Sequence, residues 1–395
     1  MSQLAIEGGQ PVRSGMLPYG RQLVDDADIA LVTAVLRGDW LTTGPMVDRF
    51  EQAFAQYVNA EHAVAVNSGT AALHAAIHVL NIGAGDEVIV PAITFAASAN
   101  CVLYVGGKPV FADVEADTLL IDPEQVEAQI TPRTKAIVAV DYAGQPCDYD
   151  ALGEIAEQYN LAIVADACHA PGGCYKERPV GVLADLNTFS FHPVKHLTTA
   201  EGGMITTNNA DFADRMRWFR NHGITTDHRQ RAEQGGWYYE MKELGYNYRL
   251  PDLNCALGLS QLEKIDEWVA RRREIADRYK SAFASVETVR TLAVRPHGRP
   301  SWHIFPILLQ LEHLQVDRAR VFSALRAENI GVNVHYIPVY WHPVYQERGY
   351  SRGLCPVAED AYQRLITLPL FASMTDQDVD DVVTAVMKIV EHYGR

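Results

Sequence analysis

Residues 187–209, NTFSFHPVKHLTTAEGGMITTNN, connect two β-like runs through a turn rich in threonine and glycine. The runs are LNTFSF (186–191) and GMITTN (203–208), and a single lysine, Lys195, lies between them. A lysine on a solvated surface needs no such frame, whereas a lysine that bonds covalently to a cofactor has to be held in place. The stretch therefore indicates a strand, a turn built around Lys195, and a second strand.

Strand-like and helix-like stretches alternate before this unit, from residue 60 onward. Helices are expected at 70–80, 96–105 and 122–130. Short apolar runs predict strands at AVAVN (63–67), EVIVP (87–91), KPVFADV (108–114), KAIVAVD (135–141) and LAIVAD (161–166). Such alternation predicts an α/β fold with a mostly parallel central sheet covered on both faces. Ligands of these sheets bind beyond the carboxyl ends of the strands.

The pattern changes after residue 250 and predicts a second, smaller domain. Apolar spacing continues along residues 251–283, which are expected to form one long helix that joins two domains. We therefore expect a large domain over residues 1–265 and a small C-terminal α+β domain over residues 266–395. The small domain is expected to contain strands at WHIFPILLQL (302–311) and GVNVHYIPV (331–339) and helices near 317–328 and 375–392.

Composition limits the class of partner. The chain has 395 residues and a formal charge of −15, from 34 basic and 49 acidic side chains. This excess of acid argues against nucleic-acid binding, which uses lysine and arginine to neutralise phosphates. The six cysteines form no C-x-x-C pair and no histidine has zinc-finger spacing, so no metal site is expected. Without a signal-peptide pattern or an apolar run that could span a membrane, we expect a cytoplasmic protein.

Four features fall at the ends of the predicted strands, and Lys195 is one of them. In NSGTAAL (67–73), Gly69 and Thr70 stand at a helix start, where backbone N–H groups and the helix dipole suit a phosphate. Phe95 follows a strand and can lie flat against an aromatic ring. Asp166 ends an apolar strand, where a buried carboxylate needs a partner such as a protonated pyridine nitrogen.

Each feature also has an ordinary structural explanation. Gly69 and Thr70 would serve as a plain helix cap, Asp166 as a cap of the following turn, and Phe95 as a core residue. Together, and in this order along the chain, the four features specify a site for pyridoxal 5′-phosphate (PLP). They supply a phosphate cradle, a stacking ring, a carboxylate for the pyridine nitrogen and a lysine for covalent attachment.

The sequence resembles the DegT/DnrJ/EryC1/StrS family of sugar-nucleotide aminotransferases over nearly its whole length. The blocks that carry the resemblance are LPYGRQ, DWLTTGP, NSGTAAL, PAITFAAS, DACHA, SFHPVKHLTTAEGG, LGYNYRLPDLNCALGLSQL and HYIPVY. The resemblance implies the fold of aspartate aminotransferase, fold type I of PLP enzymes, for the large domain. The blocks SFHPVK, TTAEGG and GYNYRLPDLNCALG are most similar to one branch, the transaminase that makes UDP-4-amino-4,6-dideoxy-N-acetyl-β-L-altrosamine in the pseudaminic acid pathway.

The resemblance also implies residue roles. Lys195 would bind PLP covalently and then move protons, and Asp166 would hold the ring nitrogen protonated. His169 would contact the ring near its 3-oxygen, with a satisfied core histidine as the alternative. Asn247 would reach the phosphate from the neighbouring subunit of a homodimer with shared active sites. The remaining cofactor contacts implied are Gly69, Thr70 and Ser190 at the phosphate and Phe95 at the ring.

Two substrates are implied by the resemblance: L-glutamate as amino donor and a UDP-4-keto sugar that accepts the amino group at C4. The positions that contact substrate in relatives correspond to Thr43, His192, Arg249, His335 and Tyr336. Two rival interpretations stay open: a transaminase of the 4-amino-4-deoxy-arabinose or perosamine type, and a regulator that keeps the fold without turnover. Retention of Lys195 argues against the regulator, and against a branch of dehydratases that carries histidine in its place.

Overall fold

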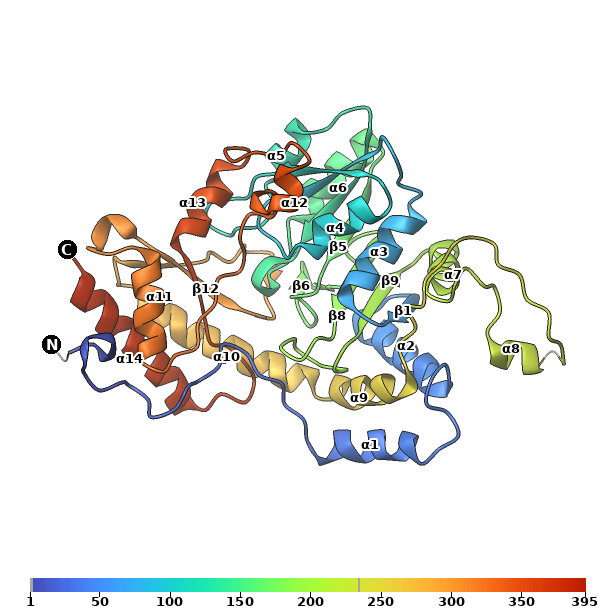
Figure 1. Ribbon diagram of the computed structural model, residues 1–395, viewed down its shortest axis with the longest axis horizontal. Coiled ribbons are helices and arrows are strands. Elements are labelled where there is room, and N and C mark those ends of the chain that lie inside the picture. The colour runs from blue at the N-terminus through green and yellow to red at the C-terminus, as the bar shows by residue number, and fades with distance from the viewer. Residues whose placement is uncertain (1–2, 234) are drawn as a thin grey trace.

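A seven-stranded sheet forms the centre of the larger part of the molecule (Figure 1). The computed structural model describes residues 3–233 and 235–395. All neighbouring strands are parallel except for β9, which runs antiparallel to β1 and β8. In sheet order the strands are β1 His62–Val66, β9 Gly203–Thr207, β8 Leu186–Ser190, β5 Ala162–Asp166, β4 Thr134–Val140, β2 Glu87–Pro91 and β3 Lys108–Ala112. The predicted α/β fold with a mostly parallel sheet is confirmed.

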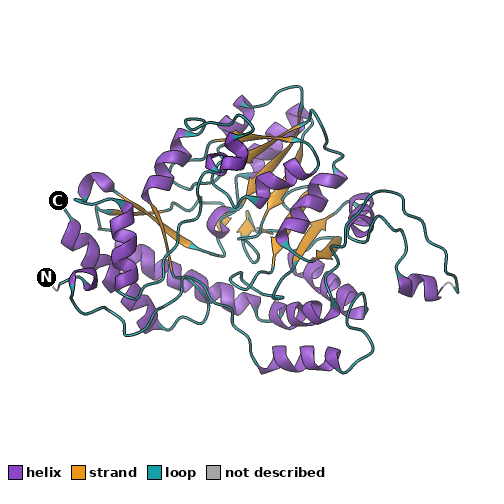
Figure 2. Cartoon of the chain, in the orientation of Figure 1, coloured by secondary structure: helices purple, strands orange, loops and turns teal. Residues whose placement is uncertain are grey.

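Helices pack around this sheet, as Figure 2 shows. α3 (Gly69–Val79) lies across β8 and β9, and α6 (Tyr149–Tyr159) contacts β5. Strand β2 is buried along its whole length, as expected for a parallel strand covered on both faces. The other helices of this part are α1 Asp26–Leu36, α2 Pro45–Val58, α4 Ala97–Tyr104, α5 Pro123–Ala128, α7 Ala210–Phe219, α8 His228–Glu233 and α9 Asp252–Leu262.

Local sequence signals explain where α5 begins and why the chain turns back after β8. At α5, the Asp122 side chain accepts a hydrogen bond from Glu124 N, and Pro123 occupies the first helical position. The turn around Lys195 reverses the chain, with Phe191 N donating to Gly202 O at 2.9 Å. Because of this reversal, β8 and β9 form an antiparallel pair instead of continuing the parallel series.

A second, antiparallel sheet forms the smaller part, with strand order β10-β12-β13. Its strands are β10 Val289–Thr291, β12 Phe305–Leu309 and β13 Leu365–Leu368. Helices α10 Ile265–Phe283, α11 Arg318–Ala327 and α13 Pro356–Arg364 contact its strands, and α14 Asp376–Tyr393 packs on α10 and α11. The short helix α12 Pro343–Gln346 precedes α13 in the chain. A short ribbon of β11 Gly298–Arg299, β6 Cys174–Tyr175 and β7 Arg178–Pro179 joins residues from both parts.

The N-terminal segment packs on this smaller part. The backbone N–H groups of Ala5 and Val12 each donate to the Glu328 carboxylate at 2.9 Å, and Leu17 forms a bridge with Ile330. Figure 1 shows both chain ends at the same end of the molecule. The domain division at residue 265 stays a prediction, and residues near the N-terminus contact elements that it assigns to the small domain.

The prediction of one long helix over 251–283 is wrong, because the structure has α9 and α10 with a break between them. At the break, Lys264 has φ −108° and ψ −3°, which interrupts the helical hydrogen-bond ladder. The Lys264 ammonium forms ion pairs with Asp25 at 2.7 Å and with Asp28 at 2.8 Å. The break therefore lies where α1 is attached to the two helices.

The prediction of a strand at 331–339 is also wrong. The backbone of this segment bonds to three different partners: Gly331 N to Leu17 O, Asn333 to Thr367, and Val339 N to Ala92 O. Only the Asn333 contact lies beside a strand of the small sheet, β13. An extended segment whose hydrogen bonds go to three places forms no ladder with any one of them.

An arm projects from the larger part, formed by the described residues of 224–246 and containing α8 (Figure 1). Several of its apolar side chains are exposed: Trp237 is 85% exposed and Leu244 is 81% exposed. Other exposed apolar side chains of the arm are Tyr238, Tyr239, Met241 and Tyr246. A concentration of exposed aromatic groups of this kind is typical of a protein–protein contact surface.

Buried histidines are concentrated beside the central sheet. Five of the described histidines are at most 8% exposed: His74, His169, His196, His303 and His335. Burial lowers the pKa of His74 and of His335 to about 4. Burial also holds the pKa of the other three well below the ordinary value of about 6.5. These side chains are therefore neutral in the folded protein near pH 7.

We expect the free energy of unfolding to decrease as the pH falls from 7.5 to 5. A histidine whose pKa is lowered by folding binds a proton more readily in the unfolded chain, so acid favours unfolding below about pH 6.5. Asp141, whose pKa burial raises to about 7, acts in the opposite direction but is one group against five. Urea midpoints at the two pH values test this, and equal midpoints would contradict it. In His74→Phe, the free energy of unfolding should depend less steeply on pH, because unfolding takes up about one proton fewer.

Candidate active site

A cavity of about 520 Å³ opens at the carboxyl ends of the parallel strands, where the sequence predicts the ligand site. Its walls come from the strand ends, from the start of α3, from the loop before α4 and from the segment 333–336 of the smaller part. Ten of the predicted site residues line it: Gly69, Thr70, Phe95, Asp166, His169, Ser190, His192, Lys195, His335 and Tyr336.

Lys195 is held by the turn that joins β8 to β9. Its backbone N–H donates to His192 O at 2.9 Å, and Thr199 N donates to Phe191 O at 3.0 Å, so the turn is closed on both sides. Burial lowers the pKa of the Lys195 amine, and the positive charge of Arg272 lowers it further. Cys168 and Asp166 oppose these effects. The amine is therefore neutral more often than that of a surface lysine, as a nucleophile or a base must be.

Asp166 ends β5, with its side chain 6% exposed. Two donors from different elements hold its carboxylate: Cys168 N donates to Oδ1 at 3.3 Å, and Ser98 Oγ donates to Oδ2 at 2.6 Å. The pairing of β5 with β8 brings Asp166 level with Thr188, two residues before Ser190. A negative charge is thus fixed in the wall of the same cavity as Lys195.

The first turn of α3 forms a cradle at another wall of the cavity. Ser68 caps the helix by accepting a hydrogen bond from Ala71 N. A Cβ on Gly69 would lie 2.8 Å from the Cβ of Ser190, so only glycine fits between the helix and β8. Free backbone N–H groups at a helix start, with the Thr70 and Ser190 hydroxyls beside them, suit a phosphate group.

Aromatic side chains surround the space between the cradle and Asp166. Phe95 lines the cavity but is 60% exposed, and its ring centroid lies 6.1 Å from that of Tyr336. The Tyr336 hydroxyl is 3.1 Å from His169 Nε2. His169 Nδ1 is buried without a hydrogen-bond partner among the described residues. A planar ligand with a polar substituent would supply the partner that Nδ1 lacks.

These observations fit PLP. A phosphate would occupy the glycine cradle, a ring would lie against Phe95, and the ring nitrogen would face the carboxylate of Asp166. Lys195 shares the cavity with all three groups. No group of three histidine, cysteine, aspartate or glutamate side chains in the described ranges is arranged to hold a metal ion. In the same ranges, no helix has the length and apolar character needed to cross a membrane.

Three predicted site residues lie outside this cavity in the single chain. Thr43 and Arg249 line a second cavity of about 350 Å³, where Arg249 Nη1 donates to Asn221 Oδ1 at 2.8 Å. Asn247 lines neither cavity, although its carbonyl accepts a hydrogen bond from Asn67 Nδ2 at 3.3 Å. The single chain therefore does not bring these three residues into the wall of the Lys195 cavity.

The structure adds residues to this site that the sequence does not single out. Tyr19, Ser98, Cys168, Glu201, His303 and Asn333 line the cavity or contact a residue that does. Ser98 follows Thr94 by four residues at the start of a predicted helix, so the two hydroxyls could be placed on one face. Nothing in the sequence brings Tyr19 and Asn333 to Lys195, because they come from segments far apart in the chain.

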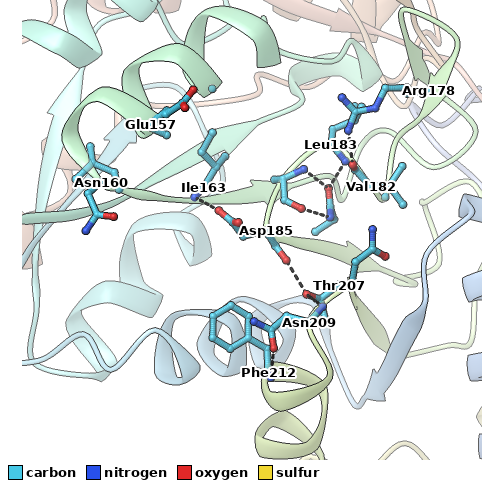
Figure 3. Close-up of a pocket in the computed structure, with 17 residues that line it drawn as sticks. Glu157, Asn160, Ile163, Arg178, Val182, Leu183, Asp185, Thr207, Asn209 and Phe212 are labelled. Atoms are coloured by element: carbon cyan, nitrogen blue, oxygen red, sulfur yellow. Dashed lines mark hydrogen bonds between the residues drawn. The ribbon is translucent and has the colours of Figure 1, made fainter.

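The largest cavity described, about 630 Å³, lies elsewhere (Figure 3). It is at the opposite ends of the strands, beside Ile163 of β5 and Asn187 of β8, with α6 and α7 as its sides. Its polar groups bond to one another: Ile163 N donates to Asp185 Oδ2, and Thr207 Oγ1 donates to Asp185 O, both at 2.8 Å. None of its lining residues has a buried polar atom without a partner, so we assign it no ligand.

Comparison with known proteins agrees with a PLP site in the cavity around Lys195. The model of the DegT/DnrJ/EryC1/StrS aminotransferase family matches residues 22–387. The spore coat polysaccharide biosynthesis protein SpsC of Bacillus subtilis is 44% identical over 382 residues, which are 96% of this chain and 98% of SpsC.

Two solved structures are also similar to this chain. The putative sugar aminotransferase Spr1654 of Streptococcus pneumoniae, in its PMP form, has a TM-score of 0.90 at 33% identity and covers 95% of this chain and 99% of its own. Helicobacter pylori PseC, described as an aminotransferase involved in the biosynthesis of pseudoaminic acid, has a TM-score of 0.89 at 32% identity over 96% of this chain and 100% of its own. The family predicted from the sequence is confirmed, and this chain belongs to the DegT/DnrJ/EryC1/StrS aminotransferase family.

Proposed function

We propose that this protein is a PLP-dependent sugar-nucleotide aminotransferase. It would transfer the amino group of L-glutamate to C4 of a UDP-4-keto-6-deoxy-N-acetylhexosamine, giving UDP-4-amino-4,6-dideoxy-N-acetyl-β-L-altrosamine. The observation that carries the proposal is the placing of Lys195, Asp166 and the Gly69 cradle around one cavity. Likeness to PseC, an aminotransferase involved in the biosynthesis of pseudoaminic acid, supports this choice of sugar.

Under this proposal, each side chain of the site has a separate role. PLP, when bound, supplies an aldehyde for the lysine and an electron-withdrawing ring. Lys195 would hold the cofactor covalently and, once released, would move a proton between the substrate carbon and the cofactor, for which its lowered pKa suits it. Asp166 would hold the ring nitrogen protonated. Gly69, Thr70 and Ser190 would bind the phosphate, and Phe95 and His169 would orient the ring.

The outer part of the cavity is suited to the substrates. His192, His335 and Tyr336, predicted as substrate contacts, line it together with Tyr19, Glu201 and Asn333. His335 is fixed by Thr367 through Nδ1 at 3.0 Å and by Asn333 through Nε2 at 3.3 Å. These polar groups would bind the sugar and the donor carboxylate beyond the reacting carbon.

A homodimer would complete the site. Phe95 is exposed at the cavity mouth, the arm carries exposed aromatic side chains, and Thr43, Asn247 and Arg249 lie outside the cavity of their own chain. A two-fold contact would place the second cavity of one copy at the Lys195 cavity of the other. Asn247 would then contact the phosphate of the partner copy, with Thr43 and Arg249 at the substrate.

A second candidate acceptor is favoured by the relation to SpsC. SpsC acts in spore coat polysaccharide biosynthesis and is 44% identical to this chain, against 32% for PseC. The acceptor would then be the 4-keto sugar nucleotide of a different surface polysaccharide, with the same Lys195 chemistry. Both candidates share the reaction and differ in the sugar and nucleotide contacts.

Borohydride reduction of the purified protein, followed by peptide mapping, tests the cofactor assignment. We expect a pyridoxyl group on Lys195. Lys195→Ala should lose this attachment, and its kcat should fall by about 100- to 10,000-fold, the usual range for loss of a general base. Lys176→Ala is the matched control, because that lysine is exposed and paired with Asp150. Attachment at another lysine, or full turnover by Lys195→Ala, would overturn the assignment.

A panel of 4-keto sugar nucleotides separates the two candidate acceptors. With L-glutamate as donor, we expect kcat/KM for the UDP-4-keto-6-deoxy-N-acetylhexosamine to exceed that for dTDP- and GDP-4-keto sugars by at least about tenfold. The product is identified by mass and by the configuration at C4. A preference for a dTDP or GDP sugar would favour the second candidate.

Mixed dimers test the shared site. Lys195→Ala and Arg249→Ala should each have little activity as homodimers. In a mixed dimer with shared sites, one site carries both defects and the other is intact. Random mixing of equal amounts should therefore recover about one quarter of wild-type activity, since half of the dimers are mixed and each has one working site. No recovery, with mixed dimers verified by two affinity tags, would contradict shared sites.

A further inference from the structure

Two hydroxyl groups lie behind the carboxylate of Asp166. Ser98, on α4, and Thr94, in the preceding loop, are both buried. Ser98 Oγ lies 2.6 Å from Asp166 Oδ2, 2.6 Å from Thr94 Oγ1 and 3.2 Å from the carbonyl oxygen of Phe95. One hydroxyl thus contacts both the Asp166 carboxylate, which would face the ring nitrogen of PLP, and the backbone of Phe95, whose side chain would lie against the ring.

The position of the Ser98 proton follows from charge and distance. A hydroxyl has a single proton, and a carboxylate attracts it more strongly than a neutral oxygen does. The 2.6 Å contact with Asp166 has the length of a hydrogen bond to a charged oxygen, whereas 3.2 Å to Phe95 O exceeds the usual O–H···O range. Ser98 therefore donates to Asp166, and its own oxygen accepts the proton of Thr94.

We propose that Ser98, supported by Thr94, is a positioning residue that fixes the Asp166 carboxylate and keeps its negative charge against the ring nitrogen of PLP. This inference rests on the proposed function. Among the described residues, the other hydrogen bonds to this carboxylate come from Cys168, through its backbone N–H at 3.3 Å and through its side chain. Ser98 makes the shorter of the two measured contacts, and it comes from α4, outside the loop that follows β5.

Several titratable groups from neighbouring elements lie around the Asp166 carboxylate, to which Ser98 donates. The titratable groups that act on Asp166 or are affected by it from neighbouring elements are Cys101 on α4, Asp141 after β4, Tyr149 on α6, Cys168, Lys195 and Tyr336. Asp141 is itself buried and its Oδ2 has no partner in the described ranges. Without the Ser98 hydroxyl, a proton would move from the ring nitrogen toward Asp166, and the ring would withdraw electrons less strongly.

The test is a pH titration of the visible absorbance of the lysine-linked cofactor in wild type, Ser98→Ala, Ser98→Thr and Thr94→Val. Loss of positive charge on the ring makes the linking nitrogen easier to protonate, so we expect the midpoint of Ser98→Ala to rise by about one unit. Its kcat should fall by about 10- to 100-fold, the range for one hydrogen bond to a charged group. The KM for glutamate should change little.

The other variants separate positioning from general damage. Ser98→Thr keeps the hydroxyl and should restore the wild-type midpoint, and Thr94→Val should shift it upward by less than Ser98→Ala does. Asn100→Ala is the matched control, because it removes a 2.6 Å hydrogen bond between the same helix and Tyr345, away from Asp166. If the melting curve shows that Ser98→Ala does not fold, Thr94→Val decides the test. A Thr94→Val midpoint equal to that of wild type would then overturn the inference.

Two further results would also overturn it: a Ser98→Ala midpoint equal to that of wild type, or an equal shift in Asn100→Ala. Both leave the proposed function intact, since wild type still binds PLP at Lys195. A wild-type protein without lysine-linked absorbance would instead overturn the proposed function, and this inference with it.

Discussion

The site depends on one buried negative charge, the carboxylate of Asp166 at the end of β5. A carboxylate in the interior is costly unless hydrogen bonds and a positive partner offset the loss of water. Two donors, Ser98 Oγ and Cys168 N, satisfy part of this need. The parallel sheet places the carboxylate in the same cavity as Lys195, and under the proposed function a cationic ring attached to that lysine would meet the remaining need.

Residues that follow buried strands were the easiest to predict. Asp166 and Ser190 are the last residues of their strands, Lys195 follows in the turn after β8, and the ends of neighbouring strands meet at one edge of the sheet. The Gly69 cradle follows from a helix start after β1, and its steric contact with Ser190 explains the glycine. For these positions, the order of elements along the chain was enough to bring the residues together.

Contacts that depend on tertiary packing were not predictable. The break between α9 and α10 is stabilised by Lys264 with Asp25 and Asp28, which come from the other end of the sequence. The segment 331–339 divides its hydrogen bonds among three partners, although its apolar, β-branched pattern is that of a strand. Ser98 has no pattern that separates it from any serine at a helix start.

The N-terminal segment has a consequence for how the chain is made. Its backbone is bound to Glu328 and Ile330, which are synthesised some three hundred residues later. At usual rates of translation, this segment waits roughly 15 to 65 s after its own synthesis for those partners. During biosynthesis the smaller part therefore cannot be completed ahead of the larger one, and the central sheet has time to assemble first.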